Sequence, residues 1–490
     1  MGIVAGLDSS SEFTRIVVCD TDTGAVIREG HAAHPPLPDD GGKRTEIDPQ
    51  AWLLALGEAA TGGLLEGVQA IGVSAQQQGV VLLDQTGNSV RPALVGNDQR
   101  EQTAAADLVD AFGGRTAWAH AVGSVPEAGR PVVKLRHLAR TEPENARQVA
   151  AVLQPHDWLT WQLLGRPARR TTDRGDASAT GYWSPATGSW RPDLLELALG
   201  HQVALPEVIG PAQAAGQTPE GLMISAGTGE TMAAAFGLGL YPGDAVVSLG
   251  ASGSVSAVHH EALTDPTGTV TSLADATGMY LPVVRTQNAV RVLRGTAELL
   301  GRDLPGLSEL ALNSTPGAYG LVMLPYLEGE RTPELPHTAG TLAGLRRESM
   351  KPEHLARAAF EGMLCGLADA LEVLRVRGVQ VRRVFLLGSA AELPAVQALA
   401  PALFGAQVLI PSPADYTTLG AARQAAWALG AAEGRLTDRE PPHWPSPDCR
   451  VLDPGDDFHV GQAVRQQYTA VRDQTHPGAF PQPDPTQPAY

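Results

Sequence analysis

The chain has few cysteines and few aromatic residues, and both shortages limit the kinds of protein it can be. Only three cysteines occur among 490 residues, Cys19, Cys365 and Cys449, and their spacing fits neither a metal site nor a disulfide framework. A reducing compartment is therefore expected. Aromatic residues make up 5% of the chain and hydrophobic residues 43%, so a core built mainly from Ala, Val and Leu is expected.

Basic residues are also in the minority, since 36 Lys and Arg face 53 Asp and Glu for a formal net charge of −17. That balance disfavours nucleic acid or an anionic membrane as a partner. There is no apolar run of the ~18 residues that a membrane span needs, and the opening MGIVAGLDSS does not read as a signal peptide. A cytoplasmic protein acting on small molecules is expected, and an anionic substrate would need local cationic or amide groups.

The length of the chain predicts two domains of roughly 200 to 250 residues each. Residues 3–7 and 15–20 are apolar or β-rich runs on either side of the polar turn 8–14, and residues 25–30 form a third candidate strand. Residues 245–248 and 255–259 repeat this strand, turn and strand pattern around GASGS.

Helices are expected at 49–60 after Asp48, at 351–376, and as a surface helix at 458–474. Strands such as VLLDQ and VFLLG alternate with the helices. These patterns predict a duplicated α/β architecture with a ligand cleft between two halves. The predicted ranges are 1–241 for the N-terminal domain, 242–440 for the C-terminal domain and 441–490 for a proline-rich segment that ends in a mobile tail.

Two turns carry residues suited to phosphate chemistry. The turn after the first strand, DSSSEFT, places Asp8 beside hydroxyls and backbone amides, a setting for Mg²⁺ and phosphate. The second turn, SLGASGS, offers glycines and hydroxyls at the equivalent position of the second half. Each turn alone is equally consistent with an ordinary hairpin.

Ten ordered blocks then resemble the FGGY carbohydrate kinases, and within them the xylulokinases, over nearly the whole chain. The blocks are the GLD opening, IGVSAQQQG at 71–79, NDQR at 97–100, PHDWLTWQL at 155–163, DRGDASATGYW at 173–183, AGTGETMAAAFG at 226–237, SLGASG at 248–253, LPYLEGERTP at 324–333, FEGMLCGLAD at 360–369 and LLGSAAELP at 386–394. The resemblance implies two actin-like, ribonuclease-H-like domains and transfer of a phosphoryl group from ATP, with Mg²⁺, to a ketopentose such as D-xylulose.

The resemblance also implies roles for individual residues. Glu230 takes the place of the general base, and Asp8 the place of a catalytic and metal-binding carboxylate. Sugar contacts are implied at Gln77, Gln78, Asn97, Asp98 and Arg100. Nucleotide contacts are implied at Ser10, Ser11, Arg15, Gly250, Ala251, Ser252, Gly388, Ser389 and Ala390. By contrast, Glu330 and Arg331 are expected to brace the cleft, the helix around Cys365 to pack in the core, and His156 to be structural.

Several of these positions depart from the family pattern. The usual aspartate and asparagine are Glu230 and Thr231, the usual histidine beside the sugar is Gln78, and the usual tryptophan is Gly96. On the nucleotide side, Ser10, Ser11, Arg15, Ala251, Ser389, Ala390 and Glu392 replace the common residues.

These departures leave three readings open: an active kinase for a ketopentose, an FGGY kinase for another sugar or polyol, and a catalytically impaired protein of this shape that binds a sugar or a partner. Homodimerisation is compatible with all three.

Overall fold

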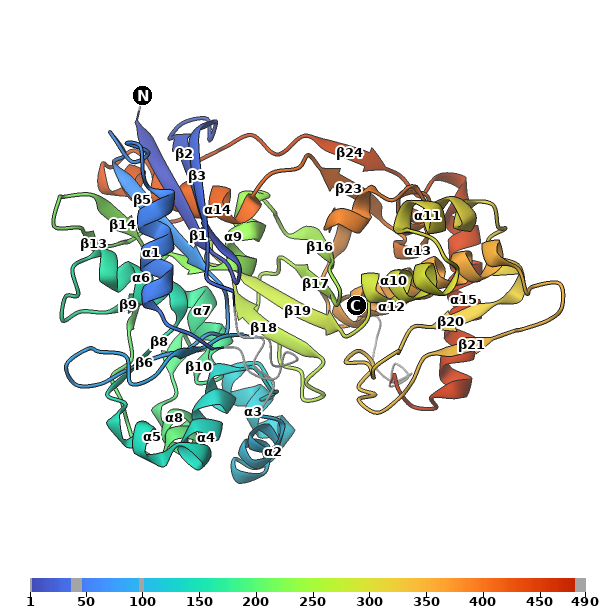
Figure 1. Ribbon diagram of the computed structural model, residues 1–490, viewed down its shortest axis with the longest axis horizontal. Coiled ribbons are helices and arrows are strands. Elements are labelled where there is room, and N and C mark those ends of the chain that lie inside the picture. The colour runs from blue at the N-terminus through green and yellow to red at the C-terminus, as the bar shows by residue number, and fades with distance from the viewer. Residues whose placement is uncertain (1, 37–45, 97–100, 481–490) are drawn as a thin grey trace.

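The computed structural model describes residues 2–36, 46–96 and 101–480. Two seven-stranded sheets lie side by side, with helices between and around them (Figure 1). The first sheet belongs to the N-terminal half and has the order β13-β14-β5-β1-β2-β3, with β15 also paired to β5. Its strands are β1 (Ile3–Ser9), β2 (Phe13–Asp20), β3 (Val26–Ala33), β5 (Ala70–Ala75), β13 (Ala214–Gln217), β14 (Met223–Ser225) and β15 (Thr228–Gly229).

The second sheet has the order β18-β19-β17-β16-β22-β23-β24. Its strands are β16 (Gly243–Leu249), β17 (Gly253–Ala257), β18 (Val270–Ala274), β19 (Tyr280–Thr286), β22 (Val381–Leu387), β23 (Gln407–Pro411) and β24 (Cys449–Leu452). In each sheet an antiparallel hairpin, β1–β2 or β16–β17, has a parallel strand beside its first member. The predicted duplication is therefore confirmed in the strand pairing.

Ten short strands form small two-stranded sheets between the larger elements. They are β4 (Glu46–Ile47), β6 (Val81–Leu83), β7 (Ala93–Leu94), β8 (Ala151–Leu153), β9 (Thr171–Thr172), β10 (Trp183–Ser184), β11 (Ser189–Trp190), β12 (Glu207–Val208), β20 (Val322–Leu324) and β21 (Thr341–Ala343).

The helices surround the sheets and supply most of the buried alanine. They are α1 (Gln50–Ala59), α2 (Gln102–Ala111), α3 (Arg115–Val122), α4 (Pro131–Thr141), α5 (Pro143–Gln148), α6 (Pro155–Leu163), α7 (Arg174–Ala179), α8 (Pro192–Leu199), α9 (Glu230–Gly237), α10 (Val290–Leu299), α11 (Leu304–Leu312), α12 (Pro352–Arg375), α13 (Pro394–Phe404), α14 (Tyr416–Ala432) and α15 (Phe458–Thr475). None of the described helices is both long and apolar enough to cross a membrane.

Helix α14 lies far along the chain but packs on the N-terminal sheet, where its orange ribbon meets the blue strands in Figure 1. Its alanine face covers Val4, Val17 and Ala70. The approach is close enough to require glycine, since a Cβ on Gly6 would meet the carbonyl oxygen of Thr418 at 1.9 Å. The C-terminal part of the sequence therefore completes the core of the N-terminal half.

The hairpin β18–β19 of the second sheet reaches in the opposite direction and contacts the N-terminal half. The amide of Ala274 donates to the Ser178 hydroxyl at 2.9 Å, and Arg130 donates to the Thr271 hydroxyl at 2.6 Å. Figure 1 shows this hairpin beneath the N-terminal sheet, beside α7. The two halves are thus joined at α14 and at this hairpin.

Most elements predicted from the sequence are confirmed. The expected helices appear as α1, α12 and α15 within two residues of their predicted ends, and Cys365 is fully buried in α12. Helix α15 is more than a surface helix, because Val464 and Tyr468 join the core and Arg472 forms an ion pair with Asp369 at 2.6 Å. The predicted tail at 481–490 lies outside the described residues.

Candidate active site

Glu230 is the first residue of α9, directly after the turn 227–229 that joins this helix to the sheet. Strand β15 aligns Thr228 and Gly229 with Ser74 and Ala75 of β5, so the turn is held at the end of the first sheet. At this position the positive end of the helix dipole favours a carboxylate. The half-buried side chain of Glu230 is thereby fixed at the edge of the N-terminal half.

The surroundings of Glu230 raise its pKa to about 7. Burial is the largest cause, and the negative charge of Asp176 adds to it. The backbone amide of Gln77, which donates to the carboxylate, and the positive charge of Arg285 act in the opposite direction. A carboxylate with a pKa near neutrality can accept a proton from a hydroxyl group and is therefore suited to general-base chemistry.

Asp8 lies near the end of β1, and its charge interacts with that of Glu230. Burial raises the pKa of Asp8 well above its usual value, and the charges of Glu230 and Asp415 raise it further, while the neighbouring Ser74 hydroxyl opposes the shift. Its Oδ1 is buried and has no hydrogen-bond partner within the described ranges. A buried, unsatisfied carboxylate oxygen beside two further acids fits a divalent cation, which prefers oxygen ligands.

The predicted sugar-binding residues fall partly within reach of Glu230. Gln77 is buried, and its side-chain amide donates to Asp176 Oδ1 at 3.3 Å. The half-buried Gln78 has a left-handed backbone with φ 64°, which is rare for a residue with a side chain. The predicted contacts Asn97, Asp98 and Arg100 lie outside the described residues.

Gly96, where the resemblance leads one to expect tryptophan, is held close to the backbone of Gln77. A Cβ at this position would lie 2.6 Å from the carbonyl oxygen of Gln77. A larger residue could be accommodated only if one of the two chain segments moved. The local backbone therefore leaves no space for the tryptophan that the resemblance leads one to expect at this position.

A cavity of about 360 Å³ opens between the two halves and is lined by charged side chains from both. Arg285 of β19 projects into it and lies 3.7 Å from Glu127, which precedes α4. Burial lowers the pKa of Arg285 to about 10, although the charges of Glu127 and Glu230 oppose that change. Arg285 therefore connects this cavity electrostatically with Glu230, yet no sequence motif distinguished it.

Glu330 braces the loop at the rim of this cavity, as its intact sequence block predicted. Its carboxylate accepts hydrogen bonds from the backbone of Gln287 and Arg331 and from the Asn288 side chain, the last at 3.0 Å. Because its carboxylate already accepts these three hydrogen bonds, Glu330 holds the loop around residues 287–288 and 330–331 in place.

In the first of the two predicted phosphate-binding turns, residues 8–14, the side chain of Ser10 already binds backbone amides. Ser10 Oγ accepts from the amides of Glu12 and Phe13 at 3.3 and 3.2 Å, and the Ser10 amide donates to the Phe13 carbonyl at 3.0 Å. Arg15 contacts Glu29 and Asp415, each at 3.5 Å. The amides that a phosphate would need here are thus already hydrogen-bonded within the turn.

The second turn, at 250–252, is exposed and faces the start of α10. Its carbonyl groups at Gly250 and Ala251 accept from the amides of Val290 and Ala289 at 3.0 and 3.1 Å. Across the adjoining strand, Gly388 has φ 103° and leaves no room for a Cβ beside Leu249. Glycine is therefore required at 388.

The two residues after Gly388 differ in exposure. The side chain of Ser389 is exposed, whereas the methyl group of Ala390 is buried in the core. A nucleotide could therefore contact Ala390 only through its backbone.

Comparison with known proteins accounts for this arrangement. The N-terminal domain of the FGGY family of carbohydrate kinases matches residues 3–239, and its C-terminal domain matches residues 246–429. The chain belongs to the FGGY family of carbohydrate kinases. The join between the two matched ranges falls between the two sheets, so this FGGY kinase has the duplicated α/β fold expected from its sequence.

Similar proteins include several called xylulose kinase. That of Streptomyces coelicolor is 39% identical over 462 residues, which cover 92% of each chain. That of Streptomyces rubiginosus is 38% identical over 450 residues, covering 90% of this chain and 89% of the relative. Among solved structures, the xylulose kinase from Bifidobacterium adolescentis has a TM-score of 0.88 and 35% identity, and the match covers 96% of this kinase and 99% of that chain.

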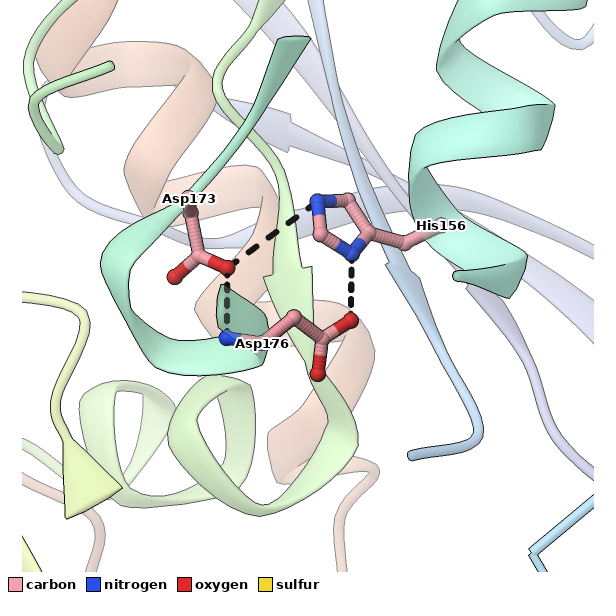
Figure 2. Close-up of side chains that lie close together, drawn as sticks. All are labelled: His156, Asp173 and Asp176. Carbon is pink, nitrogen blue, oxygen red and sulfur yellow. Dashed lines mark hydrogen bonds and ion pairs between the residues drawn. The ribbon is translucent and has the colours of Figure 1, made fainter. Parts of the chain in front are cut away.

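A cluster of buried charges lies next to the turn that precedes Glu230, and Figure 2 shows three of its members, His156, Asp173 and Asp176. His156 of α6 places Nδ1 2.5 Å from Asp176 Oδ2 and Nε2 3.2 Å from Asp157 Oδ1, with Asp173 Oδ1 at 4.0 Å. All four side chains are almost completely buried. A histidine and two aspartates this close resemble a metal site.

His156 Nδ1, however, is already hydrogen-bonded to Asp176, and Nε2 lies within ion-pair distance of Asp157 but makes no hydrogen bond within the described ranges. Three carboxylates around one imidazole suit a protonated histidine. Burial works against the charged form, but the charges of Asp157, Asp176 and Asp173 outweigh it and raise the pKa of His156 to about 10. An imidazolium is then the cation that balances the buried acids.

Proposed function

We propose that this chain transfers the γ-phosphoryl group of ATP to a ketopentose, D-xylulose, and releases D-xylulose 5-phosphate and ADP. The observation that carries the proposal is the location of Glu230 at the start of α9, where its charge interacts with that of Asp8, in a chain that aligns over 92% of its length with a xylulose kinase. Three unpaired cysteines suit the reducing conditions of the cytoplasm.

Glu230 acts as the base in this proposal. It accepts the proton of the attacking sugar hydroxyl, whose oxygen bonds to the γ-phosphorus as the bond from that phosphorus to the ADP oxygen breaks. Phosphoryl transfer depends mainly on positioning and on charge stabilisation. A carboxylate whose pKa is about 7 is ionised in about half of the molecules at neutral pH and still binds the proton well enough to assist.

Asp8 would hold the cation, since its buried Oδ1 is unsatisfied and its neighbours are acidic. When bound, Mg²⁺ would supply neutralisation of phosphate charge. Ser10, Ser11 and Arg15 would face the phosphates from the first turn, and Gly250, Ala251 and Ser252 from the second. Gly388, Ser389 and the backbone of Ala390 would contact the nucleoside.

The sugar would lie between Glu230 and the cavity that Arg285 lines, with Gln77 and Gln78 on one side. Asn97, Asp98 and Arg100 would complete the contacts to its hydroxyl groups. A neutral polyol suits a lining in which arginines and glutamates alternate, because each hydroxyl can both donate and accept a hydrogen bond.

A second candidate is a protein of the same fold with impaired phosphoryl transfer and a binding role. Two observations favour it: Ser10 Oγ occupies amides of the first turn, and Gly96 leaves no room for a residue that could stack on a sugar. Neither change affects Glu230 or Asp8, so the active kinase is preferred.

The deciding experiment measures ADP release with Mg²⁺, ATP and D-xylulose for the native chain, Glu230→Gln and Glu230→Asp. We expect the native chain to turn over and Glu230→Gln to lose about 10²–10⁴-fold in kcat, which is what a positioned base contributes. If only Glu230→Asp is active, the chemistry has been lost through one added methylene group. If all three are silent, the binding role is supported.

Sugar choice is tested in the same assay with a panel of ketopentoses, glycerol and gluconate. We expect the highest kcat/KM for D-xylulose. A higher value for another acceptor would reject the substrate while leaving the kinase assignment intact.

A further inference from the structure

The buried cluster of His156, Asp157, Asp173 and Asp176 contacts the turn that carries Glu230. The Thr228 hydroxyl donates to Asp173 Oδ2 at 2.7 Å. On the backbone side, a Cβ at Gly227 would lie 2.6 Å from the His156 ring, and one at Gly229 would lie 2.3 Å from Asp176 Oδ1. The turn therefore rests directly on the cluster.

A second route runs from the cluster to Glu230 through Gln77. His156 Nδ1 pairs with Asp176 Oδ2, and Asp176 Oδ1 accepts from the Gln77 side chain at 3.3 Å. The backbone amide of Gln77 then donates to the Glu230 carboxylate. Asp176 is thus joined on one side to a buried imidazole and on the other to the residue that holds Glu230.

Burying three carboxylates around one imidazole is unfavourable, because each ion loses its hydration. Packing of apolar side chains would stabilise this part of the fold as well or better. A cluster of this kind next to a catalytic turn therefore calls for a role other than stability.

We propose that His156 and Asp176 are positioning residues for the phosphoryl-transfer base: His156 fixes Asp176, and Asp176 fixes Gln77 and the 227–229 turn, which together hold Glu230 in place. The inference rests on the proposed function of Glu230 as that base. Neither His156 nor Asp176 needs to contact the sugar or ATP for this role.

Charged groups from three elements face Glu230. Asp8 of β1 and Asp176 of α7 are acids, and Arg285 of β19 is a base. Of the two acids, only Asp176 contacts the buried His156 ring among the described residues. Removing its charge therefore weakens the hold of Glu230 on a proton without altering the cation site at Asp8.

The first test compares Asp176→Asn with Asp157→Asn. Both substitutions keep the shape of the side chain and remove one carboxylate that contacts His156. Asp157, however, accepts from the Gln154 amide at 2.9 Å and makes no hydrogen bond to the turn among the described residues. We expect the acidic limb of kcat/KM against pH to move to lower pH in Asp176→Asn and to stay in place in Asp157→Asn. Equal movement in both variants, or none in Asp176→Asn, would overturn the proposal.

The second test separates the two sides of the histidine ring. His156→Asn retains a donor near the Nδ1 position, toward Asp176, whereas His156→Gln retains one near Nε2, toward Asp157. We expect kcat to stay within about threefold in His156→Asn and to fall about tenfold or more in His156→Gln, with KM for ATP unchanged in both, because small displacements of a base cost rate. The reverse order would contradict a path through Asp176.

A third measurement needs no turnover. The carboxyl carbon of Glu230, assigned by its loss in Glu230→Gln, is titrated by ¹³C NMR in the native chain and in Asp176→Asn. An identical midpoint in the two proteins would overturn the positioning role. A native chain that phosphorylates no sugar would instead reject the proposed function, so the two failures are distinguishable.

Discussion

At the scale of single residues, the site depends on a carboxylate whose proton affinity is set by its neighbours. Burial and Asp176 raise the pKa of Glu230, while the Gln77 amide and Arg285 hold it down. Aspartate, one methylene shorter, would lie farther from any group that the glutamate now reaches. The environment of Glu230 is therefore as important to its function as its identity.

The pH dependence of kcat/KM follows from the pKa of Glu230. The base must be ionised, and its pKa is raised to about 7, so activity is present above this value and is lost as the pH falls through it. We expect an acidic limb near pH 7 in which kcat/KM falls tenfold per pH unit. A profile that stays flat down to pH 5.5 would show that a group other than Glu230 accepts the proton.

Asp8 gives a second prediction at this scale. In Asp8→Asn the amide cannot carry the negative charge that a divalent cation requires. We expect at least a tenfold higher Mg²⁺ concentration for half-maximal rate, measured as ADP release in a titration at saturating ATP. Unfolding temperature should not fall, because the buried Oδ1 of the native carboxylate has no partner to lose among the described residues.

At the scale of elements, the turn 227–229 connects the buried cluster of His156 and the aspartates with Glu230, so the packing of the cluster sets the position of the base. Gly227 has φ 74°, and a Cβ there would meet both the His156 ring and the Val73 carbonyl. The side chains of His156 from α6 and Asp176 from α7, together with the Val73 carbonyl of β5, thus meet a turn of three residues. The position of the Glu230 side chain therefore depends on this packing as well as on α9.

Gly227→Ala tests that packing against Gly221→Ala, a matched control. Gly221 also has a positive φ, 91°, but a Cβ there meets nothing within 4 Å. We expect Gly221→Ala to cost about 1 kcal/mol, from the backbone conformation alone. Gly227→Ala should cost at least about 2 kcal/mol more, from overpacking, and should lower kcat. Chemical denaturation and ADP release measure the two effects.

At the scale of the whole molecule, α14 makes the N-terminal half dependent on a distant segment. The helix covers a face of the first sheet that contains Val4, Val17 and Ala70, and glycines at positions 6 and 72 of the sheet permit the contact. Burying each such valine contributes about 1.5–3 kcal/mol. The predicted ranges 1–241 and 242–440 therefore place α14 and the first sheet in different domains, although the two share a core.

We expect residues 1–241 expressed alone to aggregate or to melt without cooperativity. The same fragment with residues 412–446 attached through a flexible linker should unfold cooperatively, because α14 then covers the sheet. Circular dichroism melts and size-exclusion chromatography compare the two. Cooperative unfolding of 1–241 by itself would show that the sheet is stable with this face exposed.

The sequence alone determined the duplicated α/β class, the family, and the placement of Glu230 after a glycine-containing turn. These features are local or repetitive: alternating apolar residues, turn residues and ordered motifs can be recognised without knowing which segments meet. Helices such as α12 were predicted within two residues for the same reason.

Only the tertiary structure decided which distant residues surround the base. Arg285 arrives from the second sheet, Asp176 from α7, and α14 from beyond residue 415, and no spacing in the chain links any of them to Glu230. Contacts of this kind depend on how helices and sheets pack, which local patterns do not encode. The pKa of Glu230 is therefore decided by the fold, although its position in the turn was already clear from the sequence.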